Sequence, residues 1–148
     1  MSNIEFLSQE IEFEISDPSA TSQWINSVVE QEGKDIDSIT YIFCSDEYLL
    51  SINKDHLNHD YYTDIITFDN SFSANDIIAD IFISIDRVKE NAADFNVSFS
   101  QELQRVMIHG VLHLLGYKDK TDDDQKLMRQ KEDTYISLRS NQSSTWNS

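Results

Sequence analysis

Two histidines in the segment from His109 to Asp119 have the spacing of metal ligands. If residues 100–115 form a helix, His109 and His113 lie one turn apart, with their Cβ atoms about 5–6 Å from each other on one face. Two imidazoles at that separation can bind the same cation. Three leucines and one valine make this segment apolar, and burying two unpaired imidazoles among them would be unfavourable. The pair therefore indicates a metal site, whereas a single histidine would more often be an ordinary core or surface residue.

A third ligand is predicted at Asp119. Gly116 follows the two histidines and can adopt a left-handed conformation that ends the helix, so that the chain can fold back toward them. Three protein ligands leave an open coordination position, as in catalytic zinc sites. From its spacing alone, Asp119 could equally be a solvated turn residue or a helix cap. Inside the helix, Gly110 costs about 1 kcal/mol relative to alanine, so we expect another element to approach it closely.

The composition indicates one globular domain without disulfides. A chain of 148 residues can bury roughly two-thirds of the surface that its unfolded form exposes. The single cysteine, Cys44, excludes an internal disulfide and lies in an apolar run, which predicts a small buried thiol. The first residues do not resemble a signal peptide, and no apolar run reaches the roughly 18 residues of a membrane span. We therefore expect a soluble, cytoplasmic protein with no membrane partner.

The net charge of −16 argues against a broad nucleic-acid-binding surface, because nonspecific affinity for phosphates comes mainly from lysine and arginine. Seven of the eleven basic residues nevertheless bracket the histidine motif. A bound divalent cation would add further positive charge at that place. RNA binding would thus be confined to the surroundings of the metal, and no DNA partner is expected. The seven basic residues are Arg105, Lys118, Lys120, Lys126, Arg129, Lys131 and Arg139.

Hydrophobic periodicity predicts an α+β fold. Because the strands precede most of the helices, helices packed on a small mixed β-sheet are favoured over a doubly wound parallel sheet. We predict a single domain at residues 1–139 and a disordered polar tail at residues 140–148. The predicted strands are residues 11–15, 39–44, 63–68 and 77–85; the predicted helices are residues 24–33, 45–53, 86–96, 100–115 and 122–138, with Ser45 or Asp46, Ser100 and Asp122 as N-caps.

Three further residues are candidates for supporting the site. Asp64 and Asp80 fall within predicted strands, where an ionised side chain must be exposed or paired. Exposure on the solvent face is the simpler explanation, and a hydrogen bond from one of them to a ligand histidine is the alternative. His59 lies with His56 in a polar loop where both are most simply solvated, but His59 could also help to bind a substrate.

Four segments in chain order resemble those of one family. Residues 63–68 are similar to its Thr-Asp-Val-Leu-Ser-Phe segment, and residues 79–81 to its Gly-Asp-Ile strand. Glu102 matches a glutamate on its metal-site helix, and residues 109–119 match its metal-binding motif. Over residues 40–120, the chain thus resembles the YbeY endoribonucleases of ribosomal RNA maturation.

The resemblance implies a small metal-dependent hydrolase with one bound zinc on a zincin-like helix. Its implied substrate is single-stranded ribosomal RNA. Its implied roles are maturation of the 3′ end of the small-subunit (16S) ribosomal RNA and quality control of ribosomes, with the small ribosomal subunit as partner. On this resemblance, the metal ligands would be His109, His113 and Asp119.

The chain departs from the family pattern at two places that concern chemistry. The third histidine of the family motif falls on Asp119, and the aspartate before it falls on Lys118. A carboxylate ligand lowers the positive charge of the site, so Mn²⁺ or another oxygen-preferring cation competes better with Zn²⁺. The family also tends to have an arginine six residues before the threonine of its Thr-Asp segment, and Leu57 occupies that position here. An RNA contact is therefore missing or has moved, with His59 or Lys54 as substitutes.

We hypothesise that the metal polarises a phosphoryl oxygen and acidifies a bound water. Glu102 lies two helical turns before His109 on the same face and is the candidate for proton transfer. The alternative for Glu102 is a solvated glutamate that is favoured by the helix dipole.

Three other functions compete with RNA cleavage. A zinc metalloprotease shares the histidine spacing, but such enzymes need glutamate directly after the first histidine, where this chain has Gly110. A 2-His-1-carboxylate oxygenase shares the ligand types but usually holds them on a β scaffold. The third is a ribosome-assembly or interaction protein whose metal is structural, which the charge of −16 and the absent arginine favour.

Overall fold

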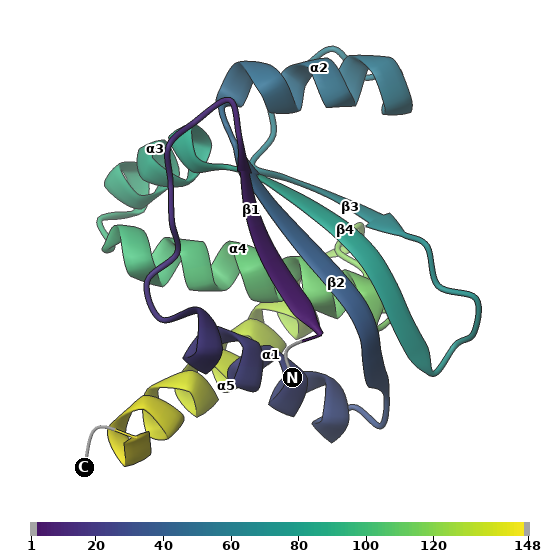
Figure 1. Cartoon of the computed structure of the whole chain (residues 1–148), viewed down its shortest axis with the longest axis vertical. Coiled ribbons are helices and arrows are strands. Elements are labelled where there is room, and N and C mark those ends of the chain that lie inside the picture. The colour runs from purple at the N-terminus through teal and green to yellow at the C-terminus, as the bar shows by residue number, and fades with distance from the viewer. Residues whose placement is uncertain (1–2, 147–148) are drawn as a thin grey trace.

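The fold is a four-stranded mixed sheet with helices on both faces (Figure 1). The computed structural model describes the backbone of residues 3–146 and the side chains of residues 3–139. The strand order is β1-β2-β4-β3, in which β1, β2 and β4 are parallel and β3 is antiparallel to β4. The predicted α+β class is therefore confirmed. The elements are β1 (Ile4–Gln9), α1 (Pro18–Gln31), β2 (Asp35–Cys44), α2 (Asp46–Leu57), β3 (Ile65–Asp69), β4 (Asp76–Ser84), α3 (Ile85–Phe95), α4 (Phe99–Leu114) and α5 (Asp122–Trp146).

The main core lies between the sheet and helices α1, α3, α4 and α5. Alternate residues of the strands point toward these helices, as the period of two in a strand requires. Trp24, Tyr41, Ile81 and Leu112 are completely buried there. On the other face of the sheet, Leu49 of α2 packs in a smaller cluster. That cluster contains Cys44, whose thiol is buried as predicted, and burial raises its pKa to about 12.

The first strand is displaced from its predicted position. Residues 11–15 alternate apolar and acidic side chains, yet they pair with no strand within residues 3–146. The strand is instead β1, and Glu10 follows it with a positive φ of 61°, which reverses the chain. The apolar side chains of residues 11–15 then pack against the core from beside the sheet. Alternation identified a half-buried extended segment but could not distinguish a paired strand from an unpaired one.

The helix ends are determined by local hydrogen bonds. Ser45 caps α2 as predicted, with its side chain accepting from the amide of Tyr48. The N-cap of α4 is Ser98 rather than Ser100, because Ser98 forms a capping box with Gln101. In α5, the hydroxyl of Thr121 accepts from the amide of Asp124.

Helix α5 is longer than the sequence predicts. The expected end is residue 138, whereas the backbone remains helical through Trp146, which includes most of the segment expected to be a disordered tail. The rest of that segment, residues 147–148, lies outside the described residues. The division into a domain at residues 1–139 and a tail at residues 140–148 stays a prediction. Within residues 3–146, no helix combines the length and apolar character needed to cross a membrane.

Candidate metal centre and RNA site

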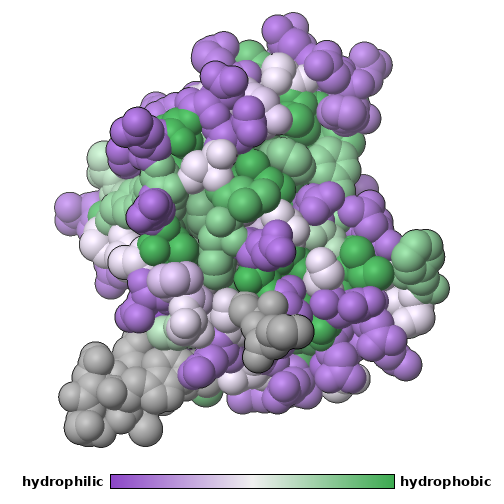
Figure 2. All heavy atoms as spheres, viewed as in Figure 1, coloured by the Kyte–Doolittle hydropathy of each residue, from purple (hydrophilic) through white to green (hydrophobic). Residues whose placement is uncertain are grey.

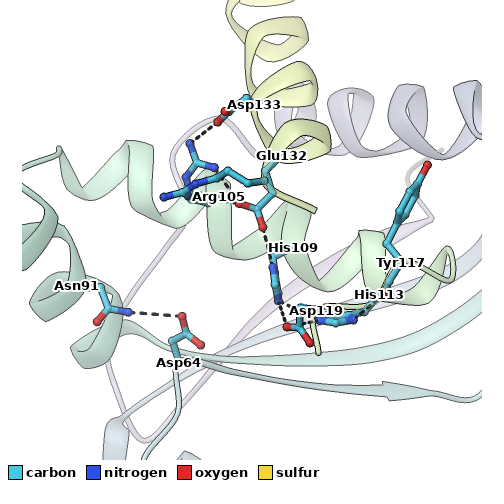
Figure 3. Close-up of polar contacts among 10 residues, drawn as sticks. Asp64, Asn91, Arg105, His109, His113, Tyr117, Asp119, Glu132 and Asp133 are labelled. Carbon is cyan, nitrogen blue, oxygen red and sulfur yellow. Dashed lines mark hydrogen bonds and ion pairs between the residues drawn. The ribbon is translucent and has the colours of Figure 1, made fainter. Parts of the chain in front are cut away.

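Helix α4 and the turn after it bring three side chains to one point (Figure 3). The Nε2 atoms of His109 and His113 are 3.0 Å apart. Gly116, with a φ of 104°, ends the helix and turns the chain back. As a result, Oδ2 of Asp119 lies 3.2 Å from Nε2 of His113 and 3.4 Å from Nε2 of His109. Among the described residues, this is the cluster of potential ligands that could hold a metal ion.

The hydrogen bonds of the two rings explain why a cation belongs between them. Nδ1 of His109 lies 2.7 Å from Oε2 of Glu132, and Nδ1 of His113 lies 3.0 Å from the carbonyl oxygen of Tyr117. Both partners are acceptors, so each Nδ1 carries the proton, and in a neutral imidazole Nε2 then carries a lone pair. If both rings are neutral, three electron-rich atoms therefore converge and repel one another. A metal ion bound between them would remove that repulsion.

The separations of the three atoms suit a single metal. In a tetrahedral site with bonds of about 2.0–2.1 Å, ligand atoms lie roughly 3.3–3.4 Å apart, close to the 3.0, 3.2 and 3.4 Å found here. The donor set of two imidazoles and one carboxylate fits Zn²⁺ and also other divalent cations. The three residues therefore fit a metal site with room for a further ligand.

Gly110 allows α4 to pack closely on the sheet. A Cβ atom at this position would lie 2.8 Å from Cδ1 of Ile65 and 3.2 Å from Oγ1 of Thr67. The close approach expected from a glycine inside a helix is thus present, and its partner is β3. The contact places His109 and His113 at the wall of a pocket of about 500 Å³.

This pocket brings together residues from α2, the following loop, β3 and α4. His59 lines it and stacks on Tyr61, with ring centroids 5.1 Å apart and the hydroxyl of Tyr61 3.0 Å from Nδ1 of His59. Leu57 lines the same pocket and is 40% exposed. The loop is held by Asn53, which donates to the carbonyl of Tyr61 at 2.8 Å. An apolar residue and an aromatic pair thus face the three candidate ligands.

Asp64 and Glu102 line a second, smaller cavity of about 190 Å³, which shares Asp64, Ile65 and His109 with the pocket. Glu102 is 5% exposed, so it is not the solvated glutamate considered above. Burial raises the pKa of Asp64, although the charge of His109 opposes that shift. Burial and then the charge of Asp64 raise the pKa of Glu102. Both carboxyl groups are therefore more readily protonated than an exposed acid.

Asp80 lies apart from this group. It is on β4 opposite Phe68, half-buried, and its Oδ2 accepts from Asn70 at 3.3 Å. Asp64 likewise bonds no histidine, and its Oδ2 is 3.5 Å from the side-chain nitrogen of Asn91. The sequence alternative in which Asp64 or Asp80 orients a ligand histidine is therefore wrong, because Glu132 of α5 has that position.

Comparison with known proteins agrees with this geometry. The profile of the family described as Endoribonuclease YbeY matches residues 3–139. The chain belongs to the YbeY endoribonuclease family. A YbeY protein from Flavobacterium psychrophilum is 55% identical over 129 residues, which cover 87% of this chain and 91% of that protein. One from Cytophaga hutchinsonii is 50% identical over 134 residues, covering 90% and 94%. A solution structure from Thermotoga maritima matches with a TM-score of 0.62 and 27% identity, covering 93% of each chain.

Two groups that support the candidate metal ligands were not identified from the sequence. Glu132 is 5% exposed and bridges His109 to Arg105, whose Nη1 lies 2.8 Å from Oε1. Burial opposes ionisation of Glu132, but His109 and Arg105 outweigh it and lower its pKa. Burial lowers the pKa of His109, but the hydrogen bond to Glu132 and the negative charges of Glu132, Asp119 and Asp64 outweigh burial and raise it. The second group is the backbone carbonyl of Tyr117, which bonds His113. Because every residue has a carbonyl, the residue types of the sequence could not identify it.

The basic residues around the YbeY motif divide into two groups. Three of them contact other side chains of the protein. Arg105 contacts Glu132 and Asp133, Lys131 contacts Glu32, and Arg139 contacts Thr21. The exposed ones are Lys118, Lys120, Lys126 and Arg129, of which Arg129 also pairs with Glu132, its Nη1 3.5 Å from Oε1. Positive charge available to a phosphate is therefore concentrated beside Asp119 and on the first turns of α5.

Proposed function

We propose that this protein is a metal-dependent endoribonuclease that cleaves single-stranded ribosomal RNA, with His109, His113 and Asp119 holding one divalent cation. The observation that supports this best is the convergence of three potential ligand atoms, within 3.0–3.4 Å of one another, at the wall of a pocket. When bound, the cation supplies a Lewis acid for a phosphoryl oxygen and lowers the pKa of a water ligand.

The protein's own residues have three tasks in this proposal. Glu132 and the carbonyl of Tyr117 keep the protons on Nδ1 of the two rings, so that Nε2 stays free to bind. Glu102 and Asp64 are candidates for holding or transferring a proton, because their raised pKa values bring them nearer to neutral pH. His59 with Tyr61 offers a surface on which an unstacked base can lie.

A single-stranded substrate suits the pocket better than a duplex. Bases of a single strand can leave the stack and lie on aromatic rings, whereas bases in an A-form helix are stacked and paired. The exposed cations near Asp119 are few, which suits contact with a short stretch of backbone. Maturation of the 3′ end of the small-subunit rRNA and quality control of ribosomes follow as proposed roles, in the cytoplasm and with the small ribosomal subunit as partner.

The competing functions lack a required feature. A metalloprotease needs a general base directly after the first histidine, and Gly110 has no side chain and packs on Ile65. An oxygenase of the 2-His-1-carboxylate type would hold its ligands on a β scaffold, whereas these histidines are on α4. A purely structural metal would be enclosed by protein ligands, whereas the cluster here lines a pocket.

Cleavage of a single-stranded rRNA precursor by purified protein tests the proposal. We expect cleavage by the wild type, loss with His113→Ala and with chelator treatment, and recovery on reloading with Zn²⁺ or Mn²⁺. His56→Ala is the matched control, because His56 is exposed, does not line the pocket and packs on Phe68. Full metal occupancy without cleavage would favour the assembly role instead.

We propose Zn²⁺ as the bound metal. Replacing Asp119 tests whether this carboxylate is a ligand that affects the choice between Zn²⁺ and Mn²⁺. We expect Asp119→His to raise the affinity for Zn²⁺ relative to that for Mn²⁺, because an imidazole prefers the softer cation. Competition between the two metals for the apoprotein measures this ratio. Asp122→His, a nearby exposed position on α5, should leave the ratio unchanged. An unchanged ratio for Asp119→His would remove Asp119 from the ligand set.

A further inference from the structure

A second groove, away from the metal centre, runs along the edge of the sheet. It has a volume of about 900 Å³, and its floor contains the aromatic rings of Phe6, Phe13 and Phe43. Phe13 stands edge-on to Phe43 with centroids 5.0 Å apart, and Phe6 stacks with Phe43 at 6.3 Å. The walls are β1 on one side and residues 11–15 with Pro18 on the other. In Figure 2, which shows this side of the molecule, apolar surface lies among hydrophilic side chains.

The groove follows an unpaired sheet edge. Strand β1 pairs with β2 alone within residues 3–146, so one row of its backbone groups faces outward. Residues 10–16 turn back beside β1 without pairing with it as a strand. The hydroxyl of Ser8 donates a hydrogen bond to the carbonyl of Phe13. The five residues from Glu5 to Gln9 offer roughly 16 Å of edge at about 3.3 Å per residue.

The charge around the groove is entirely acidic. Glu12 and Glu14 line it, and no lysine, arginine or histidine does. The first 33 residues contain no basic residue but have seven acidic ones. This end of the chain thus has the opposite charge to the lysine-rich surroundings of Asp119. The seven acidic residues are Glu5, Glu10, Glu12, Glu14, Asp17, Glu30 and Glu32.

We propose that this groove binds an extended, basic segment of a partner protein, which joins the sheet as an additional strand beside β1. Main-chain hydrogen bonds to β1 would supply the sequence-independent part of the affinity, and alternate apolar side chains would rest on the phenylalanine floor. Lysine or arginine on the same segment would pair with Glu12 and Glu14. The site is separate from the RNA site, so both can be occupied together.

Two other occupants fit less well. An RNA strand could stack on the aromatic rings, but its phosphates would meet Glu12 and Glu14 with no cation in the groove. A second copy of this chain would bring two acidic edges together, which is unfavourable for directly opposed like charges. A basic peptide is the occupant that satisfies the backbone edge, the apolar floor and the charge at once.

Fluorescence anisotropy with a defined peptide tests this. The probe is a short fluorescein-labelled peptide that alternates valine with lysine and arginine. A scrambled peptide of the same composition, with its charges grouped, controls for nonspecific attraction to an acidic protein. We expect saturable binding of the alternating peptide and slowed amide hydrogen exchange in β1. The scrambled peptide should bind more weakly and leave β1 exchange unchanged.

Paired charge variants locate the site. Glu12→Gln/Glu14→Gln should weaken binding about fivefold at low ionic strength, as expected for the loss of two exposed ion pairs. Glu30→Gln/Asp94→Asn removes the same charge from exposed positions outside the groove and should have no such effect. Equal binding of the scrambled peptide, equal affinity of both double variants, or no binding at all would overturn the proposal. The proposal would also be overturned if single-stranded oligouridine, or self-association at high protein concentration, slowed amide hydrogen exchange in β1.

Discussion

Glu132 of α5 accepts a hydrogen bond from His109 of α4, with Oε2 2.7 Å from Nδ1. Its other oxygen lies 2.8 Å from Nη1 of Arg105. A buried carboxylate is stable only when it is paired in this way. The same contact that docks α5 on α4 therefore also sets the tautomer and the direction of one candidate metal ligand.

We expect Glu132→Gln to lower metal affinity about 10–100-fold, because carboxylates that orient ligand histidines typically contribute that much. Competition with a chromophoric chelator measures the change. Asp133→Asn is the matched control: Asp133 is bound to the same Arg105 at 2.9 Å but contacts neither histidine. Wild-type affinity in Glu132→Gln, with the fold intact by circular dichroism, would contradict the positioning role.

The two histidines could be predicted because the information is local. Their separation of one helical turn is fixed by helix geometry and does not depend on how the helix packs. Gly110 likewise predicted a close contact with another element, and the structure shows that this element is β3, through Ile65. Glu132 could not be predicted in this way. It is separated from His109 along the chain, and its role depends on how α5 packs against α4, which no local pattern specifies.

The same distinction explains the error at the N-terminus. Alternation at residues 11–15 correctly indicated buried and exposed sides, since Phe13 is half-buried while Glu12 and Glu14 are exposed. It carried no information about a pairing partner. The strand that pairs is β1, and its partner β2 is distant in the sequence. The chain reverses at Glu10 through a left-handed conformation, which is uncommon for a residue with a side chain.

Gly116→Ala should reduce both stability and metal affinity. At a φ of 104°, a side chain adds strain of roughly 1–2 kcal/mol, and relief of that strain would move Tyr117 and Asp119 away from His113. Gly33→Ala is the matched control, because Gly33 also has a positive φ of 81° and, like Gly116, has nothing within 4 Å of an added Cβ. Chemical unfolding and metal titration of both variants separate strain from site geometry. Equal metal affinities would show that the turn does not position the site.

Glu32 should give the protein a stability contribution that depends on pH. Burial alone would raise its pKa, but hydrogen bonds from Tyr135 and Tyr117 and the charge of Lys131 outweigh burial and lower the pKa below 4.5. The ionised form is thus favoured in the folded state. Its contribution is present above the unfolded pKa and is lost as the pH falls through the folded pKa.

Glu32→Gln should therefore cost roughly 1–2 kcal/mol of unfolding free energy near neutral pH, and this difference from the wild type should shrink below pH 4.5. Urea unfolding at a neutral and an acidic pH measures it. The control is Glu30→Gln, an exposed position in the last turn of α1, two residues before Glu32. A difference that stays constant with pH would mean that the charge of Glu32 is not what stabilises this contact.

Leu57→Arg should strengthen RNA binding, because Leu57 lines the pocket at the position where the sequence resemblance to the YbeY family implies an arginine. One added phosphate contact should steepen the plot of log affinity against log salt by about 0.7 for a single strand. The affinity itself should rise roughly two- to fivefold at low salt. Leu127→Arg adds the same charge at a residue of similar exposure, 44% against 40%, outside the pocket. Equal salt slopes for the two variants would indicate that any gain comes from net charge rather than from a contact beside the metal centre.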